Sequence, residues 1–193
     1  MSWHSLKKPV KPKSKIMAIS YCSEAFGNHE LINCGAWEKG GIDAIAVMET
    51  DHTITDSTNA SQWTTNITSG KVEIVKQVAG ELPEASDVDV DNPVGGGNPQ
   101  INDGFTWTTT IEDANVSATN DSFWEGVNGK TIYLTLRLKN SGQILYISDA
   151  VEAIAKPIVP KNKTDLQKYM VTFRWEGRTF PARYTEPSGI FDV

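Results

Sequence analysis

Residues 132–139 read Ile-Tyr-Leu-Thr-Leu-Arg-Leu-Lys, so a large apolar side chain alternates with a polar or amphipathic one. A period of two places every second side chain on the same face of a β-strand, and here the apolar face is suited to a core. The next residues, Asn140-Ser141-Gly142, favour a turn, and residues 144–147 predict the returning strand. The stretch therefore indicates an antiparallel hairpin inside a mainly β fold.

A second hairpin is predicted toward the C-terminus. Residues 168–175 alternate in the same way, Glu176-Gly177 supplies the turn, and residues 179–184 form the predicted return. That return contains Pro181, which has no backbone N–H and is tolerated at a sheet edge. We therefore expect this strand to border solvent or a partner chain, with Pro181 as a candidate partner-binding residue.

The rest of the chain adds short elements. Further strands are predicted at residues 16–20, 42–49, 71–78 and 104–111. Short helices are predicted from Asn120 or Asp121 through Val127, over residues 59–68, and as one or two turns within residues 149–156. The predicted fold is mainly β, an antiparallel β-sandwich or barrel-like sheet with one to three short helices and an extended N-terminal arm. The arm is residues 1–15, and a single β-rich domain spans residues 16–193.

The arm is strongly basic. The chain of 193 residues has a net charge of −6, yet its first fifteen residues carry five lysines and no acid, so the remainder carries −11. The arm consists largely of spaced lysines and two prolines and has few apolar side chains to bury, so we expect it to be extended. Its positive charge predicts that it binds an acidic surface on a neighbouring copy. The candidate partner-binding lysines are Lys7, Lys8, Lys11, Lys13 and Lys15.

The body contains an acidic block. Residues 77–129 hold ten Asp or Glu and no Lys or Arg. Such a block repels polyanions, which excludes a nucleic-acid binding site in this part of the chain. It favours a surface or channel past which DNA moves without binding, a site for a basic partner, or a solvated face.

Glycine and proline mark a loop at residues 91–99. Three consecutive glycines, Gly95, Gly96 and Gly97, lie between Pro93 and Pro99. The loop lacks the Gly-Lys-Ser/Thr ending of a phosphate-binding loop. It is predicted to reach a neighbouring subunit, with a plain surface connection as the alternative.

Little in the sequence points to catalysis or metal binding. The chain has three histidines and no Gly-x-Ser-x-Gly elbow, so we predict no catalytic residue, no cofactor and no enzyme activity. Cys22 and Cys34 are expected to be reduced thiols, because no export signal and no membrane span is predicted. Alternating acids at Asp87, Asp89 and Asp91 allow either half of a calcium loop or, more simply, an acidic strand face.

Two further features point to function by resemblance. Residues 32–42, Ile-Asn-Cys-Gly-Ala-Trp-Glu-Lys-Gly-Gly-Ile, followed by Asp91-Asn92-Pro93 and Asp103-Gly104-Phe105, resemble structural proteins of phages that infect Bacteroidetes, including the crAss-like group. The likeness spans roughly residues 32–128. It implies a non-enzymatic virion protein, assembled in the host bacterial cytoplasm, whose partners are other virion proteins and copies of itself.

By architecture, the chain is most similar to the tail tube family, which implies a β-sandwich with a flanking helix, a long loop and a terminal arm. Such subunits form stacked rings with an acidic lumen that conducts DNA without binding it specifically, and a hexamer is one option for the ring. A neck, head-to-tail connector or tail-hub ring is the alternative within virions. A carbohydrate-binding β-sandwich, suggested by six tryptophans, is the alternative of another class and requires exposed indole rings.

Overall fold

The computed structural model describes residues 41–90, 101–139, 141–162 and 164–191. The chain divides into two units, Met1–Trp37 and Glu38–Val193, and all the described residues belong to the second. Its elements, in chain order, are β1 (Ile42–Met48), α1 (Ala60–Thr68), β2 (Val72–Gly80), β3 (Glu84–Val90), β4 (Ile101–Asp113), α2 (Ala118–Val127), β5 (Thr131–Leu138), β6 (Gln143–Ile158), β7 (Lys168–Gly177) and β8 (Ala182–Thr185).

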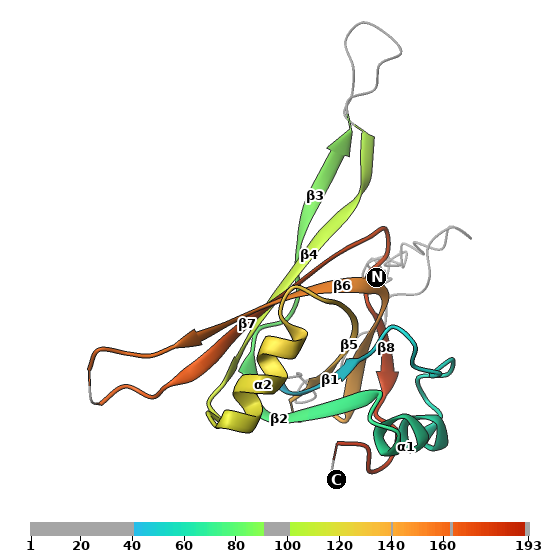
Figure 1. Ribbon diagram of the computed structural model, residues 1–193. Helices are drawn as coiled ribbons and strands as arrows, with labels where there is room; N and C mark the ends of the chain where they lie inside the picture. Colours follow the sequence, from blue (N-terminus) through green and yellow to red (C-terminus); the bar gives the residue numbers. More distant parts are fainter. Residues whose placement is uncertain (1–40, 91–100, 140, 163, 192–193) are drawn as a thin grey trace, which may run out of the picture. The chain divides into compact units, whose positions relative to one another are not determined.

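The strands form one antiparallel sheet that closes on itself (Figure 1). The order is β2-β1-β5-β6-β7-β4-β3, and an additional pairing of β2 with β4 closes the sheet, which leaves β3 outside the closed part. Closure is short, because only Val78, Ala79 and Gly80 of β2 pair with β4. The mainly β prediction is confirmed, and of its two forms the structure has the barrel-like sheet.

A large apolar cluster fills the inside of the closed sheet. The alternation that defines β5 gives it Ile132, Leu134, Leu136 and Leu138, each at most 5 % exposed. Helix α2 adds Trp124 and Val127 to the same cluster. The helix packs against β6, and the backbone N–H of Gly129, just after the helix, donates to the carbonyl of Ala153 in β6 at 2.8 Å. The inward-facing residues thus make one continuous core, which is the dominant source of stability for a sheet of this kind.

An outer layer covers one side of the sheet around β1. Ala44, Ala46 and Met48 are fully buried on the outer face of β1, beneath Trp63 of α1. The Trp63 indole N–H donates to the carbonyl of Ser57 at 2.9 Å. Asn59 caps α1 by accepting from the backbone N–H of Ser61 at 3.1 Å. The predicted helix at residues 59–68 is therefore confirmed, and it explains why β1 has no polar face.

The C-terminal segment completes this outer layer. Ile190 and Phe191 are 2 % exposed and join the same outer cluster. Arg137 on β5 contacts this segment, because its guanidinium lies 5.4 Å from the centre of the Phe191 ring and its Nη1 lies 4.0 Å from Glu186 Oε1. Its Nε lies 2.7 Å from Asp43 Oδ1 of β1, and this charged hydrogen bond holds the guanidinium in place over the ring.

Two predictions about the C-terminal half are wrong. Residues 149–156 are not helical but belong to β6, where Val151 and Ala153 point inward and Glu152 is exposed. Pairing with β7 from Glu152 onward, and with β5 at Val151 and Glu152, overrides the helical preference of Ala, Glu and Lys there. The strand after Pro181 does not return along β7 either. It is β8, which pairs with β6 over residues 143–146.

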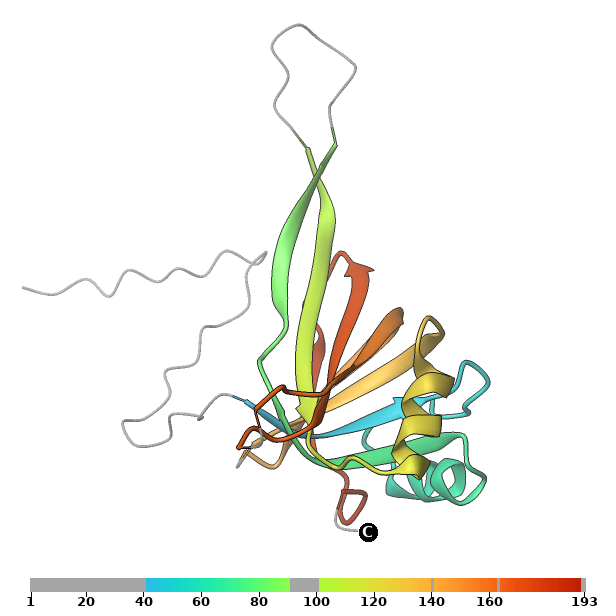
Figure 2. The same ribbon diagram turned by 60° about the vertical axis from the view of Figure 1, so that its left-hand side comes forward.

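The hairpin formed by β3 and β4 extends beyond the closed part of the sheet (Figure 2). β3 pairs with the N-terminal half of β4, whereas β2 pairs with its C-terminal end. Four successive residues of β3, from Glu84 to Asp87, are all exposed. Successive side chains of a strand point to opposite faces, so neither face of β3 is covered from Glu84 to Asp87, whereas Val88 is half-buried.

Candidate functional site

The residues predicted to bind a partner are only partly within the described structure. The five arm lysines, Lys7, Lys8, Lys11, Lys13 and Lys15, lie outside the described residues, as do Gly95, Gly96 and Gly97. Pro181 is described: it is half-buried and immediately precedes β8. Within the described residues β8 pairs only with β6, so Pro181 introduces an edge strand whose four residues are all exposed.

An aromatic cluster lies beside Pro181. Phe180 is 76 % exposed, and its ring centre lies 6.1 Å from that of Phe105 and 5.5 Å from that of Trp107. Trp107 stacks in turn on Trp175 at 6.2 Å. The Trp107 indole N–H is buried and has no hydrogen-bond partner among the described residues. Phe180 therefore covers the end of the core rather than standing free of the molecule.

The acidic block is not a single solvated face. Asp113 is 1 % exposed and Asp121 bonds to Tyr169, while Glu112 lies 2.6 Å from Lys168 Nζ. In contrast, Glu81, Glu84 and Asp87 are exposed along β3 and the residues before it. The alternation at residues 87–90 belongs to strand β3, which agrees with the strand interpretation of Asp87 and Asp89. Asp91 lies outside the described residues.

The acids near α2 position this helix. Trp124 donates its indole N–H to Asp113 Oδ2 at 3.0 Å, and the backbone N–H of Asn115 donates to Asp113 Oδ1 at 2.8 Å. Ser117, rather than the predicted Asn120 or Asp121, is the N-cap and accepts from the backbone N–H of Asn120. A buried carboxylate with two donors is satisfied, so Asp113 holds the helix against the end of β4.

Tyr169 provides a second attachment of α2 and a pH-dependent one. Its hydroxyl donates to Asp121 Oδ1, and this bond to a carboxylate, with burial, raises the pKa of Tyr169 to about 12. In the unfolded chain the phenol ionises near its ordinary pKa of 10.0, so between about pH 10 and pH 12 the unfolded state loses a proton that the folded state keeps.

We therefore expect the free energy of unfolding to fall as the pH rises through this window, and the Tyr169 contribution to be complete below it. Urea unfolding of the wild type and of Tyr169→Phe, measured at several pH values, checks this. The variant should show a shallower decline above pH 10 than the wild type. Equal slopes for the two proteins would contradict the role given to the bond with Asp121.

His52 does not pair with its neighbour Asp51, as the histidine of a catalytic triad would pair with an aspartate. His52 donates its Nδ1–H to the carbonyl of Glu49 at 2.8 Å, and its ring lies 4.8 Å from that of Tyr133. Its sequence neighbour Asp51 pairs with Lys71 at 2.8 Å, and this hydrogen bond lowers the pKa of the Asp51 carboxyl. The carboxylate is thus directed to a lysine and not to the imidazole.

Four of the six tryptophans are core residues. Trp63, Trp107, Trp124 and Trp175 are at most 4 % exposed, so none of these offers a free ring to a sugar. Trp3 and Trp37 lie outside the described residues. Over the part of the chain that the structure describes, no group of three or more His, Cys, Asp or Glu side chains could hold a metal ion. No helix among the same residues is long and apolar enough to cross a membrane.

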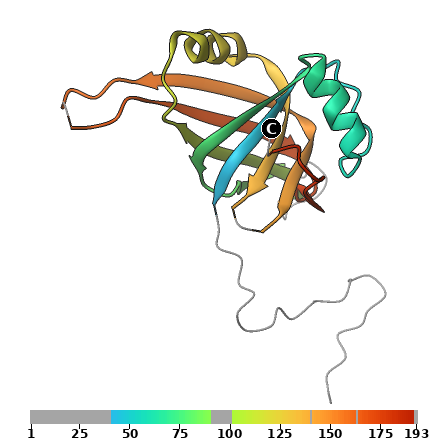
Figure 3. The ribbon, with the colours of Figure 1, turned by 90° about the horizontal axis from the view of Figure 1, so that it is seen from below.

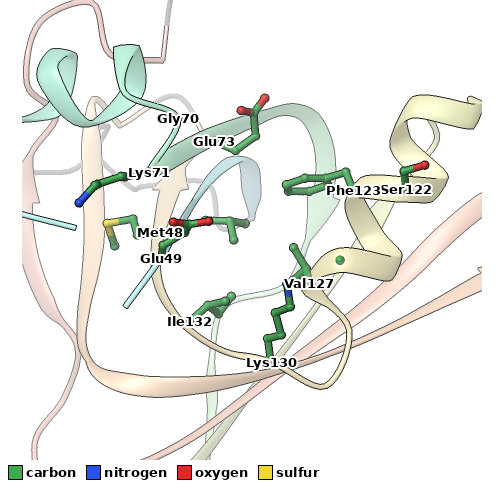
Figure 4. Close-up of a pocket in the computed structure, with 12 residues that line it drawn as sticks. Met48, Glu49, Gly70, Lys71, Glu73, Ser122, Phe123, Val127, Lys130 and Ile132 are labelled. Atoms are coloured by element: carbon green, nitrogen blue, oxygen red, sulfur yellow. The ribbon is translucent and has the colours of Figure 1, made fainter. Parts of the chain in front are cut away.

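A groove that the sequence analysis did not identify lies between β2 and α2. Two adjoining pockets of about 290 and 620 Å³ share Glu73 of β2 and Phe123 of α2. The smaller has an apolar floor of Val47, Val127 and Ile132. Figure 4 shows Phe123 pointing from α2 across toward β2. We call this feature, lined by residues 71–77 on one wall and 119–127 on the other, the β2–α2 groove.

A projecting tip is the second unpredicted feature. The long strands β6 and β7 remain paired out to Ile158 and Lys168, and we call the segment between them, described at residues 159–162 and 164–167, the β6–β7 tip. Figures 1 and 3 show this hairpin extending away from the sheet. Val159 and Leu166 in the tip are 70 % and 77 % exposed. Exposed apolar residues at such a position indicate a contact surface.

Comparison with known proteins does not identify a family. No protein-family model matches the chain, and no curated protein is significantly similar to it.

Proposed function

We propose that this chain is a non-enzymatic structural protein of a virion that assembles with copies of itself into a ring, and that the ring is part of the tail tube of a tailed phage. The observation that carries the proposal is secondary structure that the described chain leaves exposed. β3 is exposed on both faces from Glu84 to Asp87, β8 is an exposed edge strand, and the β6–β7 tip has exposed apolar side chains. A chain rarely leaves edges and apolar tips of this kind uncovered unless another chain covers them.

The charges of the described surface are compatible with a DNA-conducting lumen. Glu84 and Asp87 are exposed on β3, and Glu81 is exposed in the short segment just before it. In the proposed ring they line the channel and repel the phosphate backbone, so DNA passes without binding. A neck, connector or tail-hub ring would use the same surfaces, and position within a purified virion distinguishes these roles.

Self-assembly is the expected result for the purified full chain. Mass photometry and negative-stain imaging over a concentration series should show rings, tubes or defined oligomers. The arm lysines are predicted to bind an acidic surface of the neighbour, and exposed ion pairs contribute roughly 0.2–1 kcal/mol each. Assembly should therefore weaken as salt rises beyond about 0.15 M, where screening shortens the range of these charges.

Two results would count against the proposal. A chain that stays monomeric at all concentrations and is also missing from purified virions is not a ring subunit. Assembly that is insensitive to salt would leave the ring in place but remove the role predicted for Lys7, Lys8, Lys11, Lys13 and Lys15.

A further inference from the structure

Among the described residues, one edge of β2 has no strand partner along most of its length. β2 pairs with β1 from Val72 to Gly80, but on its other edge β4 reaches only Val78 to Gly80. Asn115 donates its side-chain N–H to the carbonyl of Lys76 at 3.4 Å from this side, so the peptide groups of Lys76 face the groove. Because peptide groups alternate between the two edges of a strand, those of Ile74 face it too. The groove thus offers backbone donors and acceptors beside an apolar pocket.

These two properties select the kind of occupant. An open strand edge pairs with an extended backbone, and an adjacent pocket takes one of its side chains. The pocket floor of Val47, Val127 and Ile132 requires that side chain to be apolar. Helix α2 forms the opposite wall, so the occupant has to be a narrow segment and not the edge of another sheet.

The same molecule carries such a segment at the β6–β7 tip. Leu166 is the most exposed of the large apolar residues within the described structure. Phe180 is almost as exposed but stacks on its own Phe105, whereas Leu166 lies beyond the last strand pair of the hairpin. Tyr169 and Lys168 tie the base of the hairpin to α2 and β4 through Asp121 and Glu112. The base of the hairpin is therefore fixed, and Figure 3 shows the hairpin projecting away from β2 and α2, which line the groove.

We infer that the β6–β7 tip of one copy docks in the β2–α2 groove of the next copy, with Leu166 in the apolar pocket and the tip backbone along the open edge of β2. This rests on the proposed self-assembly and names the contact that produces it. Tip and groove are different surfaces of one chain, so the contact is head-to-tail. Repeated contacts of this kind close into a ring or continue as a filament.

Filling the groove tests the inference without removing any native contact. Gly126 lines the pocket, and a Cβ there would meet no other atom within 4 Å. Gly126→Trp should therefore fold and obstruct the groove, while Gly126→Ala is the matched control that leaves it open. At the tip, Leu166→Asp removes the apolar anchor and Leu166→Met keeps it. Thermal unfolding of each variant establishes that it is folded.

The measured quantity is the protein concentration at half-assembly. Burial of one leucine and the relation between free energy and affinity predict that Gly126→Trp and Leu166→Asp each raise it by about ten- to one-hundred-fold. Gly126→Ala and Leu166→Met should stay within about twofold of the wild type on the same scale.

Disulfide trapping tests the geometry independently. In a background with Cys22 and Cys34 changed to Ser, one chain carries Leu166→Cys and another carries Ser122→Cys, because Ser122 lines the pocket. Oxidation of the mixture should give the heterodimer in preference to either homodimer. In the assembled wild type, hydrogen exchange at the amides of Ile74 and Lys76 should also slow relative to the monomer.

Each other outcome overturns the inference in a distinguishable way. If the wild type assembles and neither Gly126→Trp nor Leu166→Asp weakens assembly, the docking is wrong but the proposed function stands. If only Gly126→Trp weakens it, or if no heterodimer is trapped, the groove holds a different segment and the tip is not its occupant. If the wild type never assembles, the proposed function and this contact fail together.

Discussion

Replacing Trp124 with alanine should lower the free energy of unfolding by about 3–5 kcal/mol, the usual cost of deleting a large buried aromatic side chain. Trp124 is 2 % exposed and belongs to the cluster that fills the closed sheet. Its ring contacts Phe123 and Tyr169 at centroid distances of 4.8 and 6.3 Å. The substitution leaves a cavity where α2 meets the sheet and also removes one of the two donors to the buried carboxylate of Asp113.

Trp124→Phe separates the two contributions. It keeps most of the ring but has no N–H for Asp113, so the expected loss is about 1–3 kcal/mol, the cost of an unsatisfied buried polar group. Urea unfolding followed by far-ultraviolet circular dichroism measures both variants. If Trp124→Ala costs less than about 1 kcal/mol, the helix is not part of the core and the sheet must be filled without it.

The sequence predicts the strands well where one face is buried. At β5 every second residue is a large aliphatic side chain, and the pattern leaves a single register that buries all of them. The same reasoning works for β7. It fails at residues 149–156, because Ala153 and Ala155 are small enough that their inward alternation is hidden among helix-favouring residues. Only the pairing with β7 from Glu152 onward, and with β5 at Val151 and Glu152, makes this stretch part of β6.

The candidate sites were less predictable than the strands, and for a physical reason. Pro181 indicates a sheet edge, because the missing backbone N–H is a property of the residue itself. The partner of the strand that follows it is not local, since β8 pairs with β6, some forty residues earlier in the chain. The β2–α2 groove has no local signature at all. It exists because β4 leaves the sheet after Asp113 and gives way to α2 before β2 has been fully paired. Only the closed arrangement reveals it.

The short closure between β2 and β4 makes Gly80 a sensitive position. Gly80 pairs with Ile111 of β4 and with Ile42 of β1, so it lies where the ends of the sheet meet. A Cβ at Gly80 would lie 2.7 Å from Ile111 Cγ2 and 3.3 Å from both Ile42 Cβ and the carbonyl oxygen of Thr110. Ile111 is fully buried, so it has little room to move away.

Gly80→Val is therefore expected to lower the free energy of unfolding by about 1–3 kcal/mol through overpacking. Gly126→Ala serves as the control, since its added methyl group meets no atom within 4 Å and should stabilise the helix by about 0.5–1 kcal/mol. Hydrogen exchange shows where the substitution loosens the sheet. Amides of β2 and β4 near the Val78–Asp113 pair should exchange faster in Gly80→Val than in the wild type. Amides of β5 and β6 should still exchange only through global unfolding. A Gly80→Val protein as stable as the wild type, with unchanged exchange at this pair, would mean that the sheet is open between β2 and β4, and the β2–α2 groove would then be one end of a longer unpaired edge.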